Sequence, residues 1–570
     1  MNPRSYINSN IRIACWLILI QILMLPPRAE AQDLANLKNV KPFTVGGSVG
    51  LSSVFYNANG IENRQSPFSY GFNANLAMSV YGISLPLSFV WYNQQSSTFN
   101  YPSFNRFGIS PKYKWITVHA GHRNMRLSEY TLNGYTFLGA GVELTPGKFR
   151  MSAMYGKFNQ NADKNPYMLD SIPRYTRRGW AAKIGYGTEK RFVDLSMLRI
   201  GDDIDNYMPS PYPEAPTPVQ NLALGLTTVM HITPKLIFSF DGAISCYTHN
   251  AADSSRFTLS GFGTALLSNL ITINLTSVPF TAFKTSLAYK FNASAGAGIE
   301  YRRIDPEYQS LGAYFFNNDL EVISFNANAG LLKNKVILRG SLGIQHDNLG
   351  NTKKFTSQRI VGSFAGTVNF NQNWGVDANW SNYSTNQRAG RTAIIDTLRL
   401  FQVNNTFSVT PRFVKANAVR SHFVMLNINR MQLDDKNKTT AAQTETQTTV
   451  LMANYSLGFL KSRTNLTFGL NHTGIANNMY EGKTYGGSLS VAKALFSNKF
   501  SLNWANAYTI NQVGGNDGQT FNSYLSATFR PHPKHAFNLG VNFISNTYLN
   551  TETSLSYNET RGDIRYAYTF

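Results

Sequence analysis

The chain has 570 residues, with 52 Lys and Arg against 31 Asp and Glu, and 13% of its residues are aromatic. Beyond residue 31 no apolar run approaches the ~20 residues that a membrane-spanning helix needs, which excludes helical membrane spans there. Removing residues 1–31 takes away Arg4, Arg12, Arg28 and Glu30, leaving 49 basic against 30 acidic residues and a single cysteine, Cys246. One cysteine cannot form an internal disulfide.

Residues 1–31 have the layout of a secretory signal peptide. Arg4 and Arg12 precede an apolar run at 13–25, and the small-x-small sequence Ala29-Glu30-Ala31 follows it. The run is too short to cross a bilayer, so we expect cleavage before Gln32. Export from the cytoplasm also argues against nucleic acid as the partner of the basic residues.

From residue 42 to residue 570 the chain consists of amphipathic strands separated by turn sequences, with 32–41 as a short leading segment. Short turns are expected at 145–148, 188–190, 233–235, 333–335, 371–373, 460–463, 497–499 and 531–534. Longer polar connections between them include 201–218, 347–358, 432–447 and 512–519. This alternation predicts one all-β domain, a transmembrane antiparallel up-and-down β-barrel with short periplasmic turns and longer outer loops.

The alternation gives an even number of strands, about 22–26. Residues 256–282 are the weakest assignment. They are counted as one strand, with a helix or an inward-folded loop as alternatives, and 283–301 is counted as the next strand. Because a barrel this wide cannot fill its interior with wall side chains, we expect water, folded-in loops or a separate plug inside it.

The period of two assigns wall residues to a lipid face or a lumen face. In strand 177–187, Trp180, Ile184 and Tyr186 are expected to face lipid. In strand 283–301 the lipid side takes Phe283, Leu287, Tyr289, Phe291, Ile299 and Tyr301. The basic residues expected in the lumen, beside His119, are Arg106, Arg177, Lys183, Lys284, Lys290, Arg302, Arg339 and Arg565. A cationic lumen favours anionic solutes. The alternative is that the basic residues contact lipopolysaccharide headgroups or line the periplasmic turns.

No residue pattern predicts an enzyme, a cofactor or a metal. His119 and His122 lie three residues apart without a carboxylate in register, which makes an incomplete metal site. The segment from Arg302 to Leu320 stands out because it is aromatic and carries mixed charge on an outer connection. Two interpretations are open, a loop that folds into the lumen and a strand that extends above the membrane, and we favour the second.

The chain ends in RGDIRYAYTF, where Ile564, Tyr566, Tyr568 and Phe570 alternate with polar or small residues. This segment resembles the C-terminal insertion signal of Gram-negative outer-membrane barrels. Together with the export peptide and the strand rhythm, it makes the whole mature chain resemble large outer-membrane β-barrel proteins. The resemblance implies an outer-membrane location, periplasmic termini and recognition by the barrel-assembly machinery. TonB-dependent transporters carry a plug domain ahead of the barrel, for which residues 32–41 leave no room.

Two functions follow as hypotheses. The first is a channel or transport barrel for small polar or anionic solutes. The second is a non-conducting barrel in a larger outer-membrane complex for assembly, secretion or surface display. Expected partners are outer-membrane lipid and lipopolysaccharide, with other outer-membrane proteins or lipoproteins in the second case.

Overall fold

The computed structural model describes residues 42–93, 106–158, 175–204, 217–255, 270–271, 273–313, 318–353, 355–389, 401–514, 516–548 and 556–570. The expected signal peptide and leading segment, 1–41, lie outside these residues, as do 256–269. Strands dominate the described chain, because residues that alternate between apolar and polar suit a sheet with one apolar and one polar face.

The strands are β1 (Phe43–Asn59), β2 (Phe68–Val80), β3 (Ile83–Asn93), β4 (Arg106–Ile109), β5 (Lys112–Tyr113), β6 (Ile116–Arg126), β7 (Asn133–Leu144), β8 (Phe149–Lys157), β9 (Arg177–Thr188), β10 (Arg191–Asp202), β11 (Gln220–His231), β12 (Leu236–Thr248), β13 (Ser277–Lys290), β14 (Ala295–Ile304), β15 (Leu320–Leu331), β16 (Val336–His346), β17 (Phe355–Asn369), β18 (Trp374–Ala389), β19 (Phe401–Ala416), β20 (Arg420–Asp435), β21 (Thr446–Phe459), β22 (Thr464–Asn477), β23 (Glu481–Leu495), β24 (Phe500–Val513), β25 (Asn516–Phe529), β26 (His535–Tyr548) and β27 (Tyr557–Thr569). A short helix, α4 (Ala441–Thr444), lies between β20 and β21.

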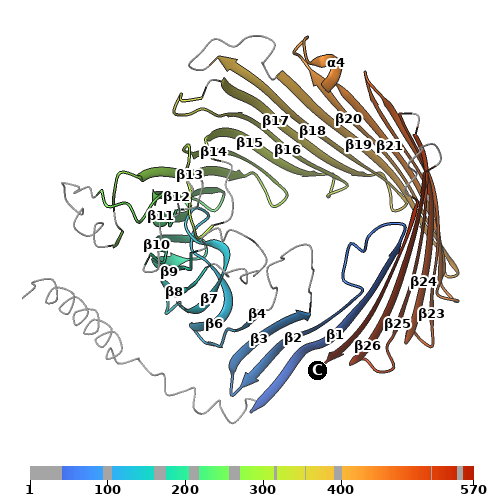
Figure 1. The fold of residues 1–570 in the computed structure, drawn as a ribbon, viewed down its shortest axis with the longest axis horizontal. Coiled ribbons are helices and arrows are strands. Elements are labelled where there is room, and N and C mark those ends of the chain that lie inside the picture. Colours follow the sequence, from blue (N-terminus) through green and yellow to red (C-terminus); the bar gives the residue numbers. More distant parts are fainter. Residues whose placement is uncertain are drawn as a thin grey trace, which may run out of the picture.

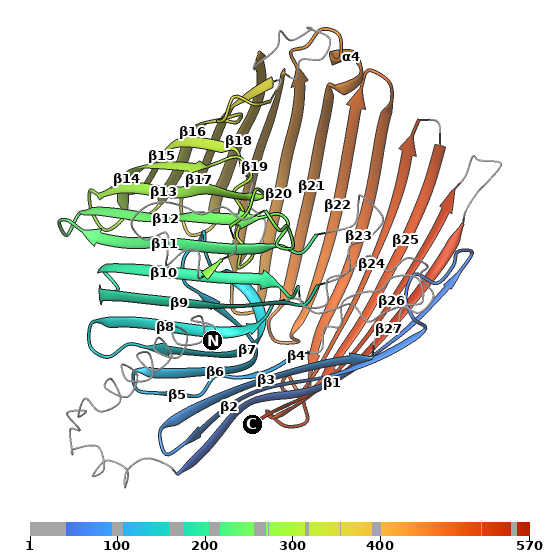
Figure 2. The same cartoon turned by 60° about the vertical axis from the view of Figure 1, so that its left-hand side comes forward.

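These strands form one closed antiparallel wall (Figure 1). Each strand pairs with its neighbours in sequence, and β1 closes the ring against β27, with Leu51 opposite Tyr566. Figure 2 shows these two strands beside each other. Because β4 and β5 both pair with β3 and with β6, they occupy one place in the wall, and the barrel has 26 strands. The predicted all-β up-and-down barrel is confirmed.

The two ends of the barrel differ as predicted, with short turns at one end and longer connections at the other. The sequence prediction was wrong at two places. Strand 283–301 is in fact the end of β13, the turn 291–294 and most of β14. Phe291 continues the alternation of Tyr289, so no break was visible in the pattern. The expected loop at 512–519 is a tight hairpin, in which Val513 pairs with Asn516.

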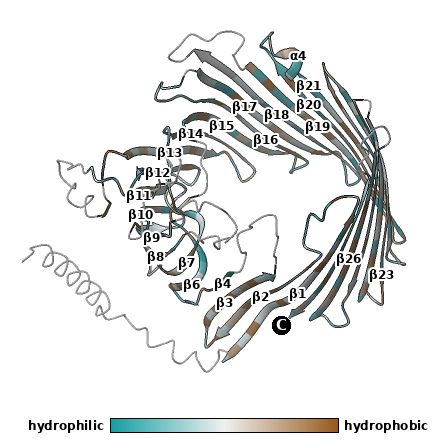
Figure 3. Cartoon of the chain, in the orientation of Figure 1, coloured by the Kyte–Doolittle hydropathy of each residue, from teal (hydrophilic) through white to brown (hydrophobic). Residues whose placement is uncertain are grey.

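The wall has one apolar and one polar face, and hydropathy alternates along its strands (Figure 3). Paired residues share a face, so the register carries this division around the ring. Ile184 is 59% exposed and stands opposite Leu195, which is 56% exposed. A wall that presents large apolar side chains outward on so many strands requires an apolar surrounding, which is the condition inside a bilayer. No helix within the described ranges is long and apolar enough to cross a membrane.

Two clusters of packed, buried hydrophobic residues lie inside one part of the wall. Their members on the wall include Phe137, Leu198, Ala223, Ala243 and Ile304, on strands between β7 and β14. They are covered by two connections, 127–132 and 305–313, which we call the insert. No described hydrophobic residue after Leu320 is counted among the buried core. The face of the wall that the insert covers is therefore the inner face of the barrel, and the face with the exposed apolar side chains is the outer one.

Candidate functional site in the barrel interior

Hydrogen bonds between backbone and side chains hold the two halves of the insert together. The Tyr308 hydroxyl donates to the Tyr130 carbonyl at 2.6 Å, and the Ser310 hydroxyl donates to the Thr131 carbonyl at 2.6 Å. The Asn133 amide donates to the Gly312 carbonyl at 3.0 Å. Burial raises the pKa of the hydroxyls of both Tyr130 and Tyr308, so both stay protonated.

Asn221 and Ser245 attach the insert to the wall. The Asn221 amide donates to Ser245 Oγ at 2.6 Å, and Ser245 Oγ donates to the Gln309 carbonyl at 2.6 Å. The Leu311 amide in turn donates to Asn221 Oδ1 at 3.2 Å. Both wall side chains are buried, and a buried polar group without a partner costs about 1–3 kcal/mol. This network therefore fixes the position of the insert.

The connection 305–319 begins and ends at the same point. The Asp305 carbonyl accepts the amides of Tyr308 and Asp319, each at 3.2 Å. Burial raises the pKa of the Asp305 carboxyl, but hydrogen bonds from Thr281 and the Arg303 guanidinium outweigh it and leave the pKa below its ordinary value.

The favoured interpretation of the segment from Arg302 to Leu320, a strand extending above the membrane, is wrong for residues 305–313. The apolar side chains of Tyr308 and Leu311 drive the connection onto the inner wall.

Glu129 of the insert lies between two of the predicted basic residues. Lys284 Nζ forms an ion pair with Glu129 Oε2, and Arg302 Nη2 lies 3.7 Å from Glu129 Oε1. Arg302 also lies 3.6 Å from Glu300. Next to them, Asp241 accepts the Ser128 hydroxyl at 2.6 Å and the Glu129 amide at 3.0 Å. Lys284 and Arg302 therefore hold the insert, and their charges are compensated.

Two further predicted residues, Arg177 and Lys183, also have acidic partners on the inner face. Arg177 binds Asp202 through two hydrogen bonds, of 2.8 and 3.1 Å. Lys183 lies 3.8 Å from Asp194, which Arg150 binds with its Nε at 2.8 Å and its Nη2 at 2.9 Å. Such bidentate Arg–carboxylate pairs are strong because the geometry of the planar guanidinium matches that of the carboxylate. The period of two that selected Arg177 also selects Asp202 and Asp194, so these partners could have been predicted.

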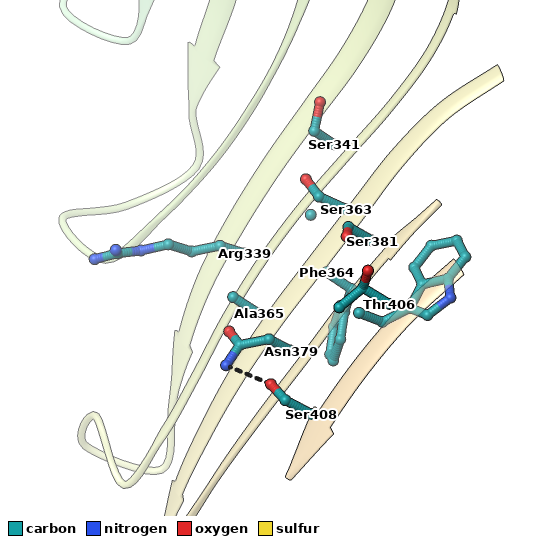
Figure 4. Close-up of a pocket in the computed structure, with 11 residues that line it drawn as sticks. Arg339, Ser341, Ser363, Phe364, Ala365, Asn379, Ser381, Thr406 and Ser408 are labelled. Carbon is teal, nitrogen blue, oxygen red and sulfur yellow. Dashed lines mark hydrogen bonds between the residues drawn. The ribbon is translucent and has the colours of Figure 1, made fainter. Parts of the chain in front are cut away.

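The register also places Arg106, Lys290, Arg339 and Arg565 on the inner face. Arg565 lies 3.0 Å from Asp563 on its own strand. Arg339 stands opposite Asn328 and Ala365 and has no acidic partner among the described residues. It lines a shallow pocket of about 350 Å³ with hydroxyl and amide side chains, including Ser363, Asn379 and Ser408. Figure 4 shows the Arg339 side chain extending from the sheet and the hydrogen bond between Asn379 and Ser408, at 3.5 Å.

The inner face of β21 to β26 differs from the rest, because none of its described residues is charged. It carries mainly Ser, Thr, Asn, Gly and Ala. Many of these side chains bond across strands, as in Thr484 to Asn511 at 2.9 Å, Thr520 to Asn546 at 2.7 Å and Thr528 to Asn538 at 2.8 Å. This sector, which we call the neutral wall, offers water and solutes a polar surface without strong charge.

The histidines and acidic residues provide no metal centre in the part of the chain that the structure describes. His119 is on the inner face, 2.8 Å from Ser110 Oγ and 3.8 Å from Glu143. His122 is on the opposite face, where its ring lies 5.3 Å from that of Phe107. Because the two histidines project from opposite sides of β6, they do not share a ligand.

The closed wall, the outward apolar face and the polar interior define a transmembrane β-barrel with an internal insert.

No protein-family model matches the chain, and no curated protein sequence matches it. Among solved structures it is similar to Acinetobacter baumannii OccAB2, with 10% identity over 66% of this chain and 98% of that chain and a TM-score of 0.29. It is similar to the PapC translocation pore of the P pilus usher, with 10% identity over 92% and 99% and a TM-score of 0.33. Pseudomonas aeruginosa OpdK, solved with vanillate, has 10% identity over 92% and 99% and a TM-score of 0.27. The assignment of this chain to its class rests on its own register and apolar face.

Proposed function

We propose that this barrel is an outer-membrane channel for small hydrophilic solutes, neutral or anionic. One observation carries the proposal. Among the described residues, the insert packs against the inner face from β6 to β15, while the neutral wall on the other side carries small polar side chains and no part of the described core. Barrels with far fewer strands already enclose an aqueous channel. A wall packed against a solid plug would be expected to bury apolar side chains there.

The arrangement of charges supports only a modest preference for anions. Lys183, Lys284 and Arg302 have acidic partners within 4 Å, so the net charge near them is small. Arg339, which has none among the described residues, is the predicted residue best placed to attract a carboxylate or phosphate. The hydroxyl and amide side chains around it would then orient the solute.

Conductance in a planar bilayer tests the proposal. We expect a steady ohmic pore, with a reversal potential in a salt gradient that indicates weak anion selectivity. R339Q should reduce the selectivity and leave the conductance within about a factor of two, because one charge is removed from a wide pore. Absence of conductance in the purified barrel, together with co-purifying outer-membrane proteins, would favour the second hypothesis of a structural subunit.

We also propose that the last strand acts as the insertion signal and that both termini are periplasmic. Tyr566 and Ile564 lie on the outward face of β27, and the Phe570 amide donates to the Gly47 carbonyl at 3.0 Å. Deletion of Phe570 should reduce the amount of barrel in outer-membrane fractions. Cleavage of intact cells by external protease within 497–499 or 531–534 would contradict the proposed orientation.

A further inference from the structure

The short-turn end of the barrel has an unusual charge composition. Within its turns the only acidic residue that the structure describes is Glu189. Lysine and arginine are distributed around the ring in these turns: Lys114, Lys148, Lys190, Lys235, Lys333, Lys335, Lys461, Arg463, Lys499, Arg530 and Lys534. Together these charges create a positive potential at this end of the barrel.

Several of these turns repeat one pattern. Six of the four-residue turns begin with an exposed apolar side chain: Ile232, Phe291, Leu332, Phe370, Leu460 and Phe496. Four of the same turns end with a basic residue: Lys235, Lys335, Arg463 and Lys499. Leu332 is 73% exposed and Phe496 is 74% exposed, which is unfavourable in water. An apolar residue and a cation three positions apart suit a boundary between hydrocarbon and charged groups.

Aromatic rings on the outward face lie directly beside these turns. Phe529 and Phe537 flank the turn 530–534, with ring centroids 6.4 Å apart, and Trp374 lies 4.7 Å from Phe413. Phe149, beside Lys148, is 52% exposed. Aromatic girdles of membrane barrels lie at the level of the lipid headgroups. The turn cations therefore lie where headgroup phosphates are expected.

The opposite end has the reverse composition. Its described connections hold Glu62, Glu129, Asp203, Asp253, Asp305, Glu307, Asp319, Asp347 and Glu445 against Arg64, Lys353, Lys436 and Lys438. Lys353 forms an ion pair with Asp319. On the short turns, by contrast, Lys235, Lys335 and Lys499 have no acidic partner among the described residues. Among the described residues, the positive charge of the connections is therefore concentrated at the short-turn end, where it is available for binding.

From this geometry we propose that the short-turn rim is a binding site for anionic phospholipid, with the turn cations contacting headgroup phosphates and the exposed apolar residues contacting the acyl chains. Each basic residue beside an anionic membrane surface adds to the attraction, so the ring as a whole selects acidic over zwitterionic lipid. The site is independent of conduction through the barrel.

Native mass spectrometry of the purified full-length barrel tests this proposal. The barrel is titrated with phosphatidylglycerol or phosphatidylcholine, and the lipids retained are counted. We expect preferential retention of phosphatidylglycerol. In the quadruple variant K235Q/K335Q/R463Q/K499Q, retention should weaken at least about tenfold. Lys483 lies near the start of β23, at the other end of the barrel, 2.8 Å from Glu481. The matched control R64Q/K436Q/K438Q/K483Q removes the same charge from that end and should retain lipid as the wild type does.

If the quadruple variant fails to fold, a salt titration of the wild-type barrel still tests the proposal. We expect 1 M salt to abolish the preference of the wild type for phosphatidylglycerol. Equal retention of the two lipids by the wild type would overturn the proposal, as would unchanged retention by the turn variant. A further outcome also counts against it. If an acidic periplasmic protein co-purifies with the wild type but not with the turn variant, while phosphatidylglycerol retention is the same, the ring binds protein and not lipid.

Discussion

The Tyr308 hydroxyl donates a hydrogen bond to the backbone carbonyl of Tyr130 at 2.6 Å, joining two connections that are 178 residues apart in the sequence. Their rings also meet edge to face, with centroids 6.2 Å apart. This contact joins the two halves of the insert, which Asn221 and Ser245 attach to the inner wall.

Replacement of Tyr308 by phenylalanine should therefore destabilise the barrel while preserving the ring packing. The Tyr130 carbonyl loses this buried partner, at a cost of about 1–3 kcal/mol. The urea concentration at which half of the barrel is unfolded measures this change, and heat-modifiable gel mobility identifies the folded form. Tyr524→Phe is the matched control, because Tyr524 is 40% exposed on the inner face and its loss of a hydroxyl should be neutral. Equal midpoints for the two variants would show that the hydrogen bond is unimportant.

A side chain at Gly312 should displace the insert. A Cβ there would meet Leu198 Cδ2 at 2.8 Å and the Thr131 carbonyl oxygen at 2.9 Å. Overpacking of this kind costs about 1–3 kcal/mol. We expect Gly312→Val to raise the single-channel conductance and to expose 305–313 to protease. Gly487→Val, where a Cβ would lie 4.0 Å from Leu470 Cδ2, should leave both unchanged. If the Gly312→Val variant has the conductance of the wild type, the insert does not partly obstruct the pore.

Acid should loosen the start of the connection 305–319. The pKa of Asp305 is lower in the folded barrel than its ordinary value of 3.8, so its ionised form stabilises the folded state above pH 3.8. This contribution is lost as the pH falls through the folded pKa. Protease cleavage near residue 305 should rise below about pH 4 in the wild type. The Asp305→Asn variant should be cleaved to a similar extent across the range, and an acid-dependent rise in that variant would assign the effect to another group.

Asp194 should be more important for stability than an ordinary acidic residue. Its side chain is 3% exposed and compensates both Arg150 and Lys183. Asp194→Asn leaves two cations on the inner wall without their carboxylate, and the loss of one partner from a buried pair costs about 3–5 kcal/mol. The same urea midpoint measures the loss. Glu189→Gln, in an exposed turn, should cost less than about 0.5 kcal/mol. A similar small effect at Asp194 would mean that water already compensates the two cations.

Most of the wall could be predicted from the sequence, but what lies inside it could not. The alternation of Ile184 and Tyr186 with Lys183 predicts the face of each residue, because the side-chain period of a strand is a local property. The same local reasoning places Lys284 and Arg302 on the inner face. It does not reveal Glu129, which reaches them only because residues 127–132 fold inward.

The insert could not be predicted because its contacts join segments that are remote in the sequence. Tyr308 meets Tyr130, and Gln309 meets Ser245, and no periodic pattern connects these pairs. The turn at 291–294 was missed for a different reason. Phe291 keeps the phase of the strand before it, and the turn contains neither glycine nor proline.

Cysteine accessibility along the neutral wall tests most directly whether the barrel conducts beside the insert. In a C246A background, Ser488→Cys places a thiol on the inner face of β23, and Leu489→Cys places one on the outward face, where the native side chain is 40% exposed. A charged, membrane-impermeant thiol reagent should lower the single-channel conductance of the Ser488 variant and leave that of the Leu489 variant unchanged. Conductance that is absent, or that is insensitive to modification at Ser488, would contradict a water-filled path along this wall.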